Sequence, residues 1–376
     1  MDNYITSVEV SKKGEGNGRG HHKAVNVGDI IEIKAHITDD KSGVKSAYVG
    51  IRTPSGLRTI FVHLHVDAEA NFWVGSYTIQ ATDEGGEYKD FFIHLEDNAG
   101  NIVNSWELLD SFEEKMKFNV NNPNGDSLAP KILDIETTTK KVNVGESVTI
   151  KASFTDDKSG VKSAYIGIKN PSGSRTLFVH LNKDTEINQW TGKYTVLPND
   201  EGGVYNQFFV HIDDNAGNTI NSWESLNLYK EKMEFTITNN DGDIKAPVVT
   251  DIEITPKEVN VNDTLTIRAN ISDDKSGVKS AYVGIKSPSG NKTLFIHLHL
   301  DEKNNIWVGS YTIKQSDQCG VYKDMFIHLE DNARNPINSW NLLDKFKGSL
   351  TFMVNNNYHS DIEPPEIKQI MIKDSK

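Results

Sequence analysis

Cysteine is almost absent from this sequence of 376 residues. Cys319 is the only one, so no disulfide can form within the chain. Long apolar runs are also missing, because no stretch approaches the roughly 18 residues of a membrane-spanning helix. Basic charge is scarce too: 40 Lys and Arg stand against 53 Asp and Glu, a formal net charge of −13. These shortages exclude a disulfide scaffold and a helical membrane span, and they argue against nucleic acid or anionic membranes as partners.

Aromatic residues, in contrast, are plentiful, with 6 Trp, 12 Tyr and 15 Phe. This content is typical of a globular chain with packed cores and not of a disordered one. At roughly 100–200 residues per domain, the length predicts about two to four domains. The N-terminal MDNYITSVEV lacks the charged and then apolar pattern of a signal peptide.

One decapeptide, DDKSGVKSAY, occurs three times, at 39–48, 156–165 and 273–282. The step is constant (156 − 39 = 117 and 273 − 156 = 117). Two sets of tryptophans keep the same step, namely Trp73, Trp190 and Trp307, and Trp106, Trp223 and Trp340. Constant spacing over two periods leaves almost no room for insertions. The chain is therefore predicted to be a tandem array of one duplicated domain.

Loop-forming residues mark the joints between the copies. Asn-rich stretches are followed by DSLAP at 126–130, DIKAP at 243–247 and DIEPP at 361–365, and Asn, Gly, Asp and Pro together favour loops. The predicted domains are residues 1–125, 126–242 and 243–360. After Pro365 the chain reads EIKQIMIKDSK, which is similar to KILDIETTTK after Pro130. We therefore interpret 361–376 as a linker and the first strand of a truncated fourth repeat, and the chain as a piece of a longer surface protein.

Short β-branched and aromatic runs alternate with turn signals inside each copy. In the first copy they predict strands near 6–10, 29–37, 45–52, 58–65, 73–80, 88–96 and 115–121. Only Trp106–Lys117 suggests a helical turn or a bulged loop, and a Gly-rich basic segment within 11–23 is predicted to be a loop of unknown role. Seven short strands in a unit of this length indicate an immunoglobulin-like (Ig-like) sandwich. The sequence thus predicts an all-β chain of three tandem Ig-like antiparallel sandwiches in an elongated array.

The pairing of TDDKSGVKS with LEDNAGN resembles the bacterial Ig-like, or fibronectin-III-like, domains of Gram-positive cell-surface and secreted proteins. The resemblance extends over all three copies and departs in the third, where Arg334 replaces Gly100 and Gly217. It implies a non-catalytic segment, extracellular or associated with the cell wall, that acts as a spacer or adhesive stalk of a larger bacterial protein. The alternative is a carbohydrate- or cell-wall-binding accessory module of a hydrolase.

Catalytic motifs find little support. The sequence has no nucleophile elbow, no phosphate-binding Gly-rich loop and no HExxH. The adjacent carboxylates Asp83 and Glu84 become Asp317 and Gln318 in the third copy, and neighbours on a strand point to opposite faces. We therefore expect no enzymatic activity and no required cofactor.

Acidic turns are the best candidates for binding a metal, and Ca²⁺ is the ion they suggest, because it takes carboxylate and amide oxygens. The DDKSG turn follows the second predicted strand and the DNAGN turn the sixth, so both can lie at one end of a sandwich. The simpler interpretation is turn capping, in which Asp and Asn accept hydrogen bonds from nearby backbone N–H groups. The joint residues Asp126, Asp243 and Asp361 can likewise be interdomain ligands or exposed linker residues. The candidate metal ligands are Asp39, Asp40, Asp97, Asn98, Asp156, Asp157, Asp214, Asn215, Asp273, Asp274, Asp331 and Asn332.

Recurrent histidines lie in FVHL-like strands, where alternation puts Val62 and Leu64 on one face and Phe61 and His63 on the other. If the aliphatic face is the core, the ring-bearing face meets solvent, and exposed aromatic clusters usually mark binding surfaces. The neighbouring strand adds Tyr48 and Arg52, and Gly50 between them is expected to leave a gap between the two histidines. A cell-surface glycan or protein is the expected ligand. The candidate binding residues are Tyr48, Arg52, Phe61, His63, Phe92, His94, Tyr165, Lys169, Phe178, His180, Phe209, His211, Tyr282, Lys286, Phe295, His297, Phe326 and His328.

Two other interpretations of this face compete with ligand binding. A zinc site at His63, His94 and Glu96 needs a fourth ligand, but the nearest candidate, His65, is Asn182 in the second copy. Cross-strand pairing, or cover by the Trp106 segment, would make the face purely structural. The chain is expected to be a monomeric rod, in which an exposed Cys319 could cross-link two chains in vitro.

Overall fold

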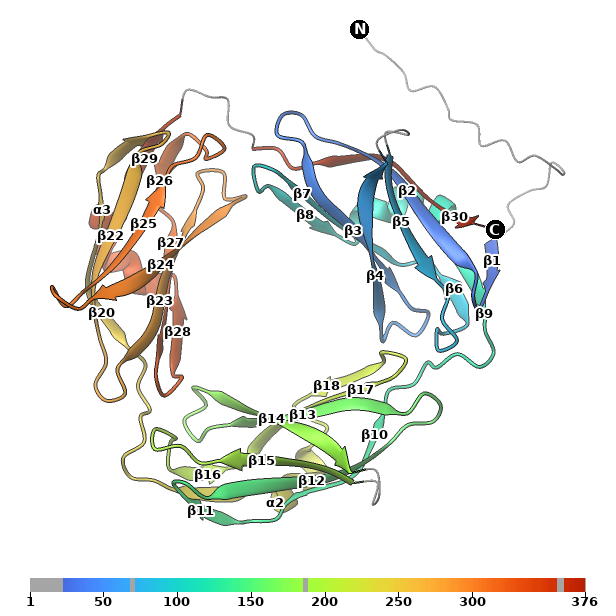
Figure 1. Cartoon of the computed structure of the whole chain (residues 1–376), viewed down its shortest axis with the longest axis horizontal. Coiled ribbons are helices and arrows are strands. Elements are labelled where there is room, and N and C mark those ends of the chain that lie inside the picture. Colours follow the sequence, from blue (N-terminus) through green and yellow to red (C-terminus); the bar gives the residue numbers. More distant parts are fainter. Residues whose placement is uncertain (1–22, 68–71, 185–188, 357–361, 376) are drawn as a thin grey trace, which may run out of the picture.

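The computed structural model describes residues 23–67, 72–184, 189–356 and 362–375 (Figure 1). Within these residues the secondary structure is almost all strand, arranged as three seven-stranded and three three-stranded sheets. Each pair of sheets encloses its own apolar core. The predicted all-β class and the three Ig-like sandwiches are therefore confirmed. Domains 1, 2 and 3 below denote the predicted ranges 1–125, 126–242 and 243–360.

Domain 1 contributes nine described strands and two short helical turns. The helical turns follow the Trp106 hairpin, as the sequence suggests. The elements are β1 (Lys23–Asn26), β2 (Ile30–Thr38), β3 (Val44–Arg52), β4 (Thr59–Asp67), β5 (Phe72–Thr78), β6 (Gly86–Tyr88), β7 (Phe91–Asp97), β8 (Ile102–Ser105), the 3₁₀ helix η1 (Glu107–Phe112), α1 (Glu113–Met116) and β9 (Phe118–Asn121). Strands β1, β6 and β8 are too short to stand out in the sequence, and the predicted strand at 6–10 lies outside the described residues.

Domain 2 repeats this order and adds a strand of its own before the first hairpin. Its elements are β10 (Lys131–Thr137), β11 (Lys141–Asn143), β12 (Ser147–Thr155), β13 (Val161–Lys169), β14 (Thr176–Asp184), β15 (Gln189–Thr195), β16 (Gly203–Tyr205), β17 (Gln207–Asp214), β18 (Thr219–Ser222), η2 (Asn227–Tyr229), α2 (Lys230–Met233) and β19 (Phe235–Thr238). The large sheet has the order β10-β12-β15-β14-β13-β17-β18, and the small one β11-β19-β16.

Domain 3 has the same topology as domain 2. Its elements are β20 (Val248–Thr255), β21 (Glu258–Asn260), β22 (Thr264–Ser272), β23 (Val278–Lys286), β24 (Thr293–Asp301), β25 (Ile306–Thr312), β26 (Gly320–Tyr322), β27 (Met325–Asp331), β28 (Pro336–Ser339), η3 (Asn341–Phe346), α3 (Lys347–Leu350) and β29 (Phe352–Asn355). A last strand, β30 (Glu366–Ser375), follows it. No helix in the described ranges is long and apolar enough to cross a membrane.

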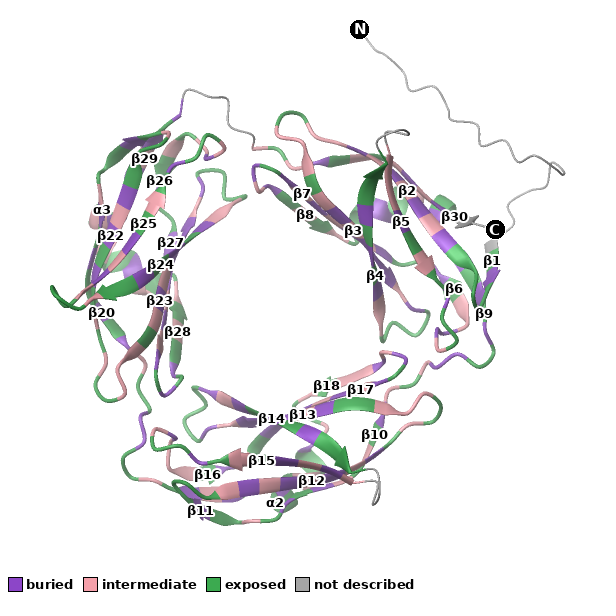
Figure 2. Ribbon diagram, viewed as in Figure 1, coloured by how far each residue is buried: buried purple, intermediate pink, exposed green. Residues whose placement is uncertain are grey.

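Period-two alternation decides which side chains enter the cores. In β4 the residues Ile60, Val62 and Leu64 are buried, whereas Phe61 and His63 between them are exposed. The pattern recurs in β14 and β24, and Figure 2 shows such alternation along the strands. Because every second residue of a strand faces the same side, the aliphatic residues of the facing sheets meet in the core.

The three domains form a closed ring, so the predicted elongated rod is wrong (Figure 1). Strand β30 pairs antiparallel with β2 of domain 1, from Glu366 opposite Thr38 to Ser375 opposite Ile30. It lies where β10 lies beside β12 and β20 beside β22. The predicted first strand of a fourth repeat does form a strand, but it completes domain 1. The physical reason is that a repeat-type first strand carries the apolar pattern that fits this position in any copy.

Candidate functional site

The ring-bearing residues lie where alternation places them, on the face of the large sheet that points away from the core of its own domain. Strand β3 runs between β4 and β7, with Tyr48 opposite both His63 and His94. Phe61 is 57% exposed, whereas its neighbour Val62 is 4% exposed. The predicted orientation is therefore confirmed. We call this surface the aromatic face, which consists of Tyr48, Arg52, Phe61, His63, Phe92, His94 and Trp106 and their equivalents in domains 2 and 3.

Tyr48 is the centre of the aromatic face. Its ring stacks on His94 with centroids 4.6 Å apart, and it contacts His63 at 5.5 Å and Phe61 edge-on at 5.6 Å. The stacked pairs Tyr165–His211 and Tyr282–His328 have centroids 4.6 and 4.7 Å apart. Such ring pairs fix one another's orientation. Because the tyrosine ring lies between the two imidazoles, the arrangement does not form the suggested zinc site.

Gly50 does not leave a gap between the histidines, contrary to the expectation. Its cross-strand partners are Phe61 and Phe92, and a Cβ at this position would lie 3.2 Å from Phe92 Cβ and 3.3 Å from Phe61 Cε1. The reason is register, because the histidines face Tyr48, two residues earlier. The glycine thus allows the two phenylalanine rings to close over the strand.

Trp106 extends the aromatic face. Its indole packs against Phe92 at 5.3 Å and lies 4.1 Å below the Arg52 guanidinium, in a cation–π contact. Lys169 over Trp223 and Lys286 over Trp340 repeat it at 5.2 and 4.7 Å. The available signal was the hairpin register: with Glu96 opposite Ile102, continued alternation brings residue 106 opposite residue 92.

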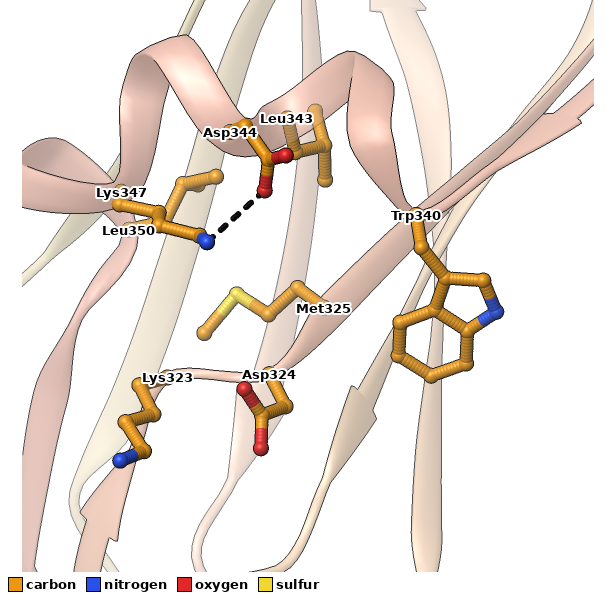
Figure 3. A pocket seen from close by; sticks show the side chains of 8 residues that line it. All are labelled: Lys323, Asp324, Met325, Trp340, Leu343, Asp344, Lys347 and Leu350. Carbon is orange, nitrogen blue, oxygen red and sulfur yellow. Dashed lines mark ion pairs between the residues drawn. The ribbon is translucent and has the colours of Figure 1, made fainter.

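In domain 3, a pocket lies next to Trp340, the equivalent of Trp106 (Figure 3). Met325, Leu343 and Leu350 supply apolar surface, and Asp344 and Lys347 form an ion pair of 2.9 Å beside it. A second pocket flanks Trp223 in domain 2, between the start of β17 and the segment that leads to α2. Charged or other polar residues make up half of the lining of the first pocket and more than half of the lining of the second, so both differ from the mainly apolar pockets that usually bind small ligands.

The strands that carry the aromatic face lie on the inner side of the ring. In domain 1 these are β3, β4, β7 and β8, and the corresponding strands of the other two domains likewise border the central opening (Figure 1). Since the cores lie behind these strands, all three aromatic faces border the same opening.

Carboxylates converge at two of the joints. In the described residues, Asp126, Asp156 and Asp214 place one oxygen each within 4.8 Å of one another, and Asp243, Asp273 and Asp274 do the same. We call these groups the joint clusters. Asp156, Asp214, Asp273 and Asp274 were candidate ligands, and Asp126 and Asp243 were the candidate interdomain ligands. The structure thus brings the turn and joint residues together.

Backbone contacts fix the joint clusters. Asp126 accepts hydrogen bonds from the N–H groups of Leu128 (3.2 Å) and Ser159 (2.9 Å), so the linker docks on domain 2. Asp156 Oδ1 accepts one from Gly160 N–H at 2.6 Å, which is the predicted turn cap. Asp156 Oδ2 is buried without a hydrogen-bond partner in the described residues, and so are Oδ2 of Asp39 and Asp273. A buried carboxylate oxygen without a partner is costly, and a cation would offset that cost.

Burial and mutual charge shift the acidity of these groups. Burial raises the pKa of Asp214, and the charge of Asp126 adds to the rise. Burial likewise raises the pKa of Asp331, which is not a member of the second joint cluster, and the charges of the cluster members Asp243 and Asp273 add to the rise. Burial would also raise the pKa of Asp126, but the hydrogen bonds from Ser159 and Leu128 outweigh it and leave that pKa below its ordinary value. The first joint cluster therefore holds carboxylates, Asp126 and Asp214, whose negative charges disfavour one another.

Several candidate ligands do not join the clusters. Asp40 and Asp157 are exposed at the turn surface. The Asn98 amide donates to the carbonyl oxygens of Ser42 and Gly43 at 3.0 and 2.9 Å, and Asn215 and Asn332 do the same in their copies. Their role is to hold the DNAGN turn against the DDKSG turn. The cluster of domain 1 would involve Asp361, which lies outside the described residues.

Sequence reasoning missed a second set of contacts between domains, which we call the latches. Arg175 is buried, pairs with Asp200, and donates to the Ala333 carbonyl oxygen of domain 3. Arg58 pairs with Asp83 and donates to the Ala216 carbonyl oxygen of domain 2. Lys292 pairs with Asp317 at 3.1 Å. Its stem lies beside Gly100, where a Cβ would be 3.4 Å from Lys292 Cε. The signal was the recurrence of a basic residue and an aspartate in all three copies.

Comparisons with known proteins identify one part of the chain. A family model described as bacterial Ig-like domain matches residues 115–224, which include most of domain 2. No curated protein matches the sequence. Among solved structures, a marsupial T cell receptor is similar at 9% identity over 56% of this chain and 95% of that chain, with a TM-score of 0.20; so low a score supports no argument. The matched family is generally non-catalytic and of a bacterial extracellular type. Residues 115–224 are thus similar to a bacterial Ig-like domain.

Proposed function

We propose that this chain is a non-catalytic extracellular segment of a larger bacterial surface or secreted protein, and that its three aromatic faces bind a cell-surface glycan or protein. The observation that carries the proposal is the repeated exposure of large rings. Phe61, Phe178 and Phe295 are each 57–59% exposed, and each packs edge-on against the tyrosine of its own aromatic face. Large apolar groups held at the surface in a cluster mark interaction sites.

A pure spacer would not need this surface. A spacer needs stable domains and joints. Its length does not depend on the stacking of Tyr48, on the Arg52 guanidinium over Trp106, or on the neighbouring pockets of domains 2 and 3. Rigid aromatic rings supply large contact area at low entropic cost, because few torsions must be fixed on binding. Arg52 and its lysine equivalents add hydrogen-bond donors beside the rings. The aromatic face thus combines apolar and polar contacts of the kind that a glycan or a peptide needs.

Three weak sites on one molecule can also act together. Linked sites that engage the same polymer gain roughly 10²- to 10⁴-fold in apparent affinity without new contacts. The common placement of the three faces on the inner side of the ring supports such joint engagement of one extended ligand. A carbohydrate- or cell-wall-binding accessory module of a hydrolase is the alternative that shares this chemistry.

The test is binding to a glycan array and to purified cell wall, with the wild-type chain and a triple Trp106→Ala, Trp223→Ala, Trp340→Ala variant. We expect binding by the wild type and loss of most of it in the variant. Leu228→Ala is the matched control, because Leu228 is 92% exposed but lies outside the aromatic face. Absence of binding by the wild type to every glycan and wall sample, and to surface proteins, would overturn the proposal and favour a spacer.

A second proposal concerns the joints, where we infer that Ca²⁺ binds to the joint clusters and stiffens them. Its support is the convergence of three carboxylates and the buried oxygen of Asp156 that has no hydrogen-bond partner in the described residues. Calorimetric titration with Ca²⁺ tests it, with Asp156→Asn and Asp273→Asn as variants. We expect heat of binding in the wild type and its loss in the double variant. Equal heats in both proteins would contradict the joint clusters as the site.

A further inference from the structure

Strand β30 is an integral part of domain 1. Its residues pair with β2 over the full length of that strand, with Ile370 opposite Ala35 and Ile372 opposite Ile33. Both isoleucines are fully buried and belong to the apolar core of domain 1. Without β30, the β2 edge of the sheet would have no partner strand among the described residues, and an unpaired edge is a template for strand addition.

The same strand position is filled differently in the other domains. In domains 2 and 3, the strand that directly follows the joint, β10 or β20, pairs with its own domain. Ile135 and Ile252 lie five residues after their joint prolines, as Ile370 does after Pro365, and all three are fully buried. The register irregularity also recurs at the start of each strand. The place beside β2, β12 or β22 therefore requires a strand with this apolar pattern. It does not require that the strand directly precede the rest of the domain in the chain.

The segment before β30 docks in the same way as the other two joints. Asn101 donates to the Glu363 carbonyl oxygen at 3.5 Å, as Asn218 donates to that of Leu128 at 3.3 Å and Asn335 to that of Lys245 at 3.5 Å. Asn291 of domain 3 adds a bond of 3.1 Å to the Ile362 carbonyl oxygen. The contact between domains 3 and 1 thus has the same type of hydrogen bond as the two joints at which one domain continues into the next. Here, however, β30 is held to the rest of domain 1 only by non-covalent contacts.

We propose that the first-strand position of domain 1 is an acceptor for the segment 366–375 of a second copy of this chain, so that copies exchange this strand and link head to tail. The closed ring is the intramolecular form of the same contact. Exchange of an identical element between copies is a low-cost route to assembly, because the contacts are the same in both forms. The mode is strand addition, in which backbone hydrogen bonds give affinity and alternate side chains give specificity.

The ring and the linked copies differ only in which chain supplies the strand. Pairing of β30 with β2 of its own chain competes with pairing to a second chain. The effective concentration of β30 near its own β2 sets the outcome, and it is in the millimolar range at best for short flexible links. Refolding at high protein concentration therefore favours exchange, whereas dilution favours the ring. Linked copies form a heterologous contact that does not close on itself unless the rotation happens to complete a larger ring.

The experiment uses single cysteines in a Cys319→Ser background. Lys34 and Met371 are direct cross-strand partners in β2 and β30. One chain carries Lys34→Cys and the other Met371→Cys, and the two are refolded together at high concentration and then oxidised. The matched control is a mixture of Lys151→Cys and Glu136→Cys chains, because these residues occupy the same places in β12 and β10. A third sample carries Lys34→Cys and Met371→Cys in one chain.

We expect a disulfide-linked dimer in the Lys34→Cys plus Met371→Cys mixture and at least tenfold less in the control mixture. An Ile370→Asp substitution in the Met371→Cys chain should abolish the dimer, because it puts a charge in the core of domain 1. If the double variant cross-links within one chain while the mixture gives no dimer, the ring exists but does not exchange, and the proposal is overturned. If no sample cross-links, the pairing of β30 with β2 is itself refuted.

Discussion

Replacement of Arg175 by alanine tests whether the latches stabilise the domains. Arg175 is 8% exposed and Asp200 is 1% exposed, so the ion pair is shielded from water. In the variant, Asp200 keeps the hydrogen bonds that Tyr194 OH and Leu197 N–H donate, both at 2.7 Å, but it loses its only cationic partner in the described residues. A buried charge without a counter-charge is the main source of destabilisation here.

The magnitude follows from the burial of the pair. Removal of one partner of a buried ion pair costs about 3–5 kcal/mol. Because two donors to Asp200 remain, we expect the lower end, about 3 kcal/mol in the free energy of unfolding of domain 2. For a domain of this size, about 1 kcal/mol corresponds to about 4 °C in Tm. The Tm of domain 2 should therefore fall by about 12 °C.

The matched control is Arg175→Lys, because domain 3 uses a lysine at this place and Lys292 holds Asp317 at 3.1 Å. We expect it to cost less than about 1 kcal/mol, the typical worth of one hydrogen bond. Hydrogen exchange read by peptide assigns the loss to domain 2, and calorimetry gives its size. Equal losses in Arg175→Ala and Arg175→Lys, or a loss spread evenly over all three domains, would refute the reasoning.

Three further predictions concern the joints, the core and the tyrosines. Millimolar Ca²⁺ should raise the Tm of the wild type relative to chelator, since ligand binding to the folded state stabilises it; an unchanged Tm in calorimetry would count against calcium. Gly192→Ala should lower the free energy of unfolding, measured by urea denaturation, by about 3 kcal/mol, because the added Cβ would lie 2.6 Å from the His180 carbonyl oxygen. A loss below about 1 kcal/mol would show that the two strands can move apart to make room. Burial, with the charge of a nearby aspartate, raises the pKa of Tyr77, Tyr194 and Tyr311 above the ordinary value of 10.0. Their contribution to stability is therefore full below about pH 10 and is lost as the pH rises further. The tyrosinate absorbance of these three residues, measured as the difference from a variant with all three replaced by Phe, should appear together with unfolding and not before it.

The single domain could be predicted from sequence because its signals are local. Alternation in FVHL-type strands identifies both the core face and the aromatic face, since the side-chain period of a strand is two. The Asp and Gly residues of the DDKSG turn likewise indicate a capped turn, and the hydrogen bond of 2.6 Å from Gly160 N–H to Asp156 is of that kind. What failed in the site depended on register between strands. Gly50 faces Phe61 instead of His63 because of the register between β3 and β4, which no local pattern reveals.

The arrangement of the domains could not be predicted because it depends on contacts between distant residues. The latch of Arg58 reaches Ala216, more than a full repeat away, and a lone arginine after a turn gives no sign of such a partner. Ring closure depends on the pairing of 30–38 with 366–375. The sequence does show that 366–375 is a repeat-type first strand. It does not show which domain that strand completes, because the same apolar pattern suits all of them.

This interchangeability connects the architecture to the proposed function. Near-identical copies make near-identical joints, and each joint combines a docked linker, a latch and a pair of facing turns. Repetition of one joint geometry turns successive domains by a similar step, so the chain curves and its aromatic faces stay on one side. A straight rod would instead need successive joints that alternate in direction or do not bend. Because the joints are equivalent, a chain that opens at β30 should keep its curvature, and its aromatic faces should remain on the concave side whether the strand is supplied by the same chain or by the next.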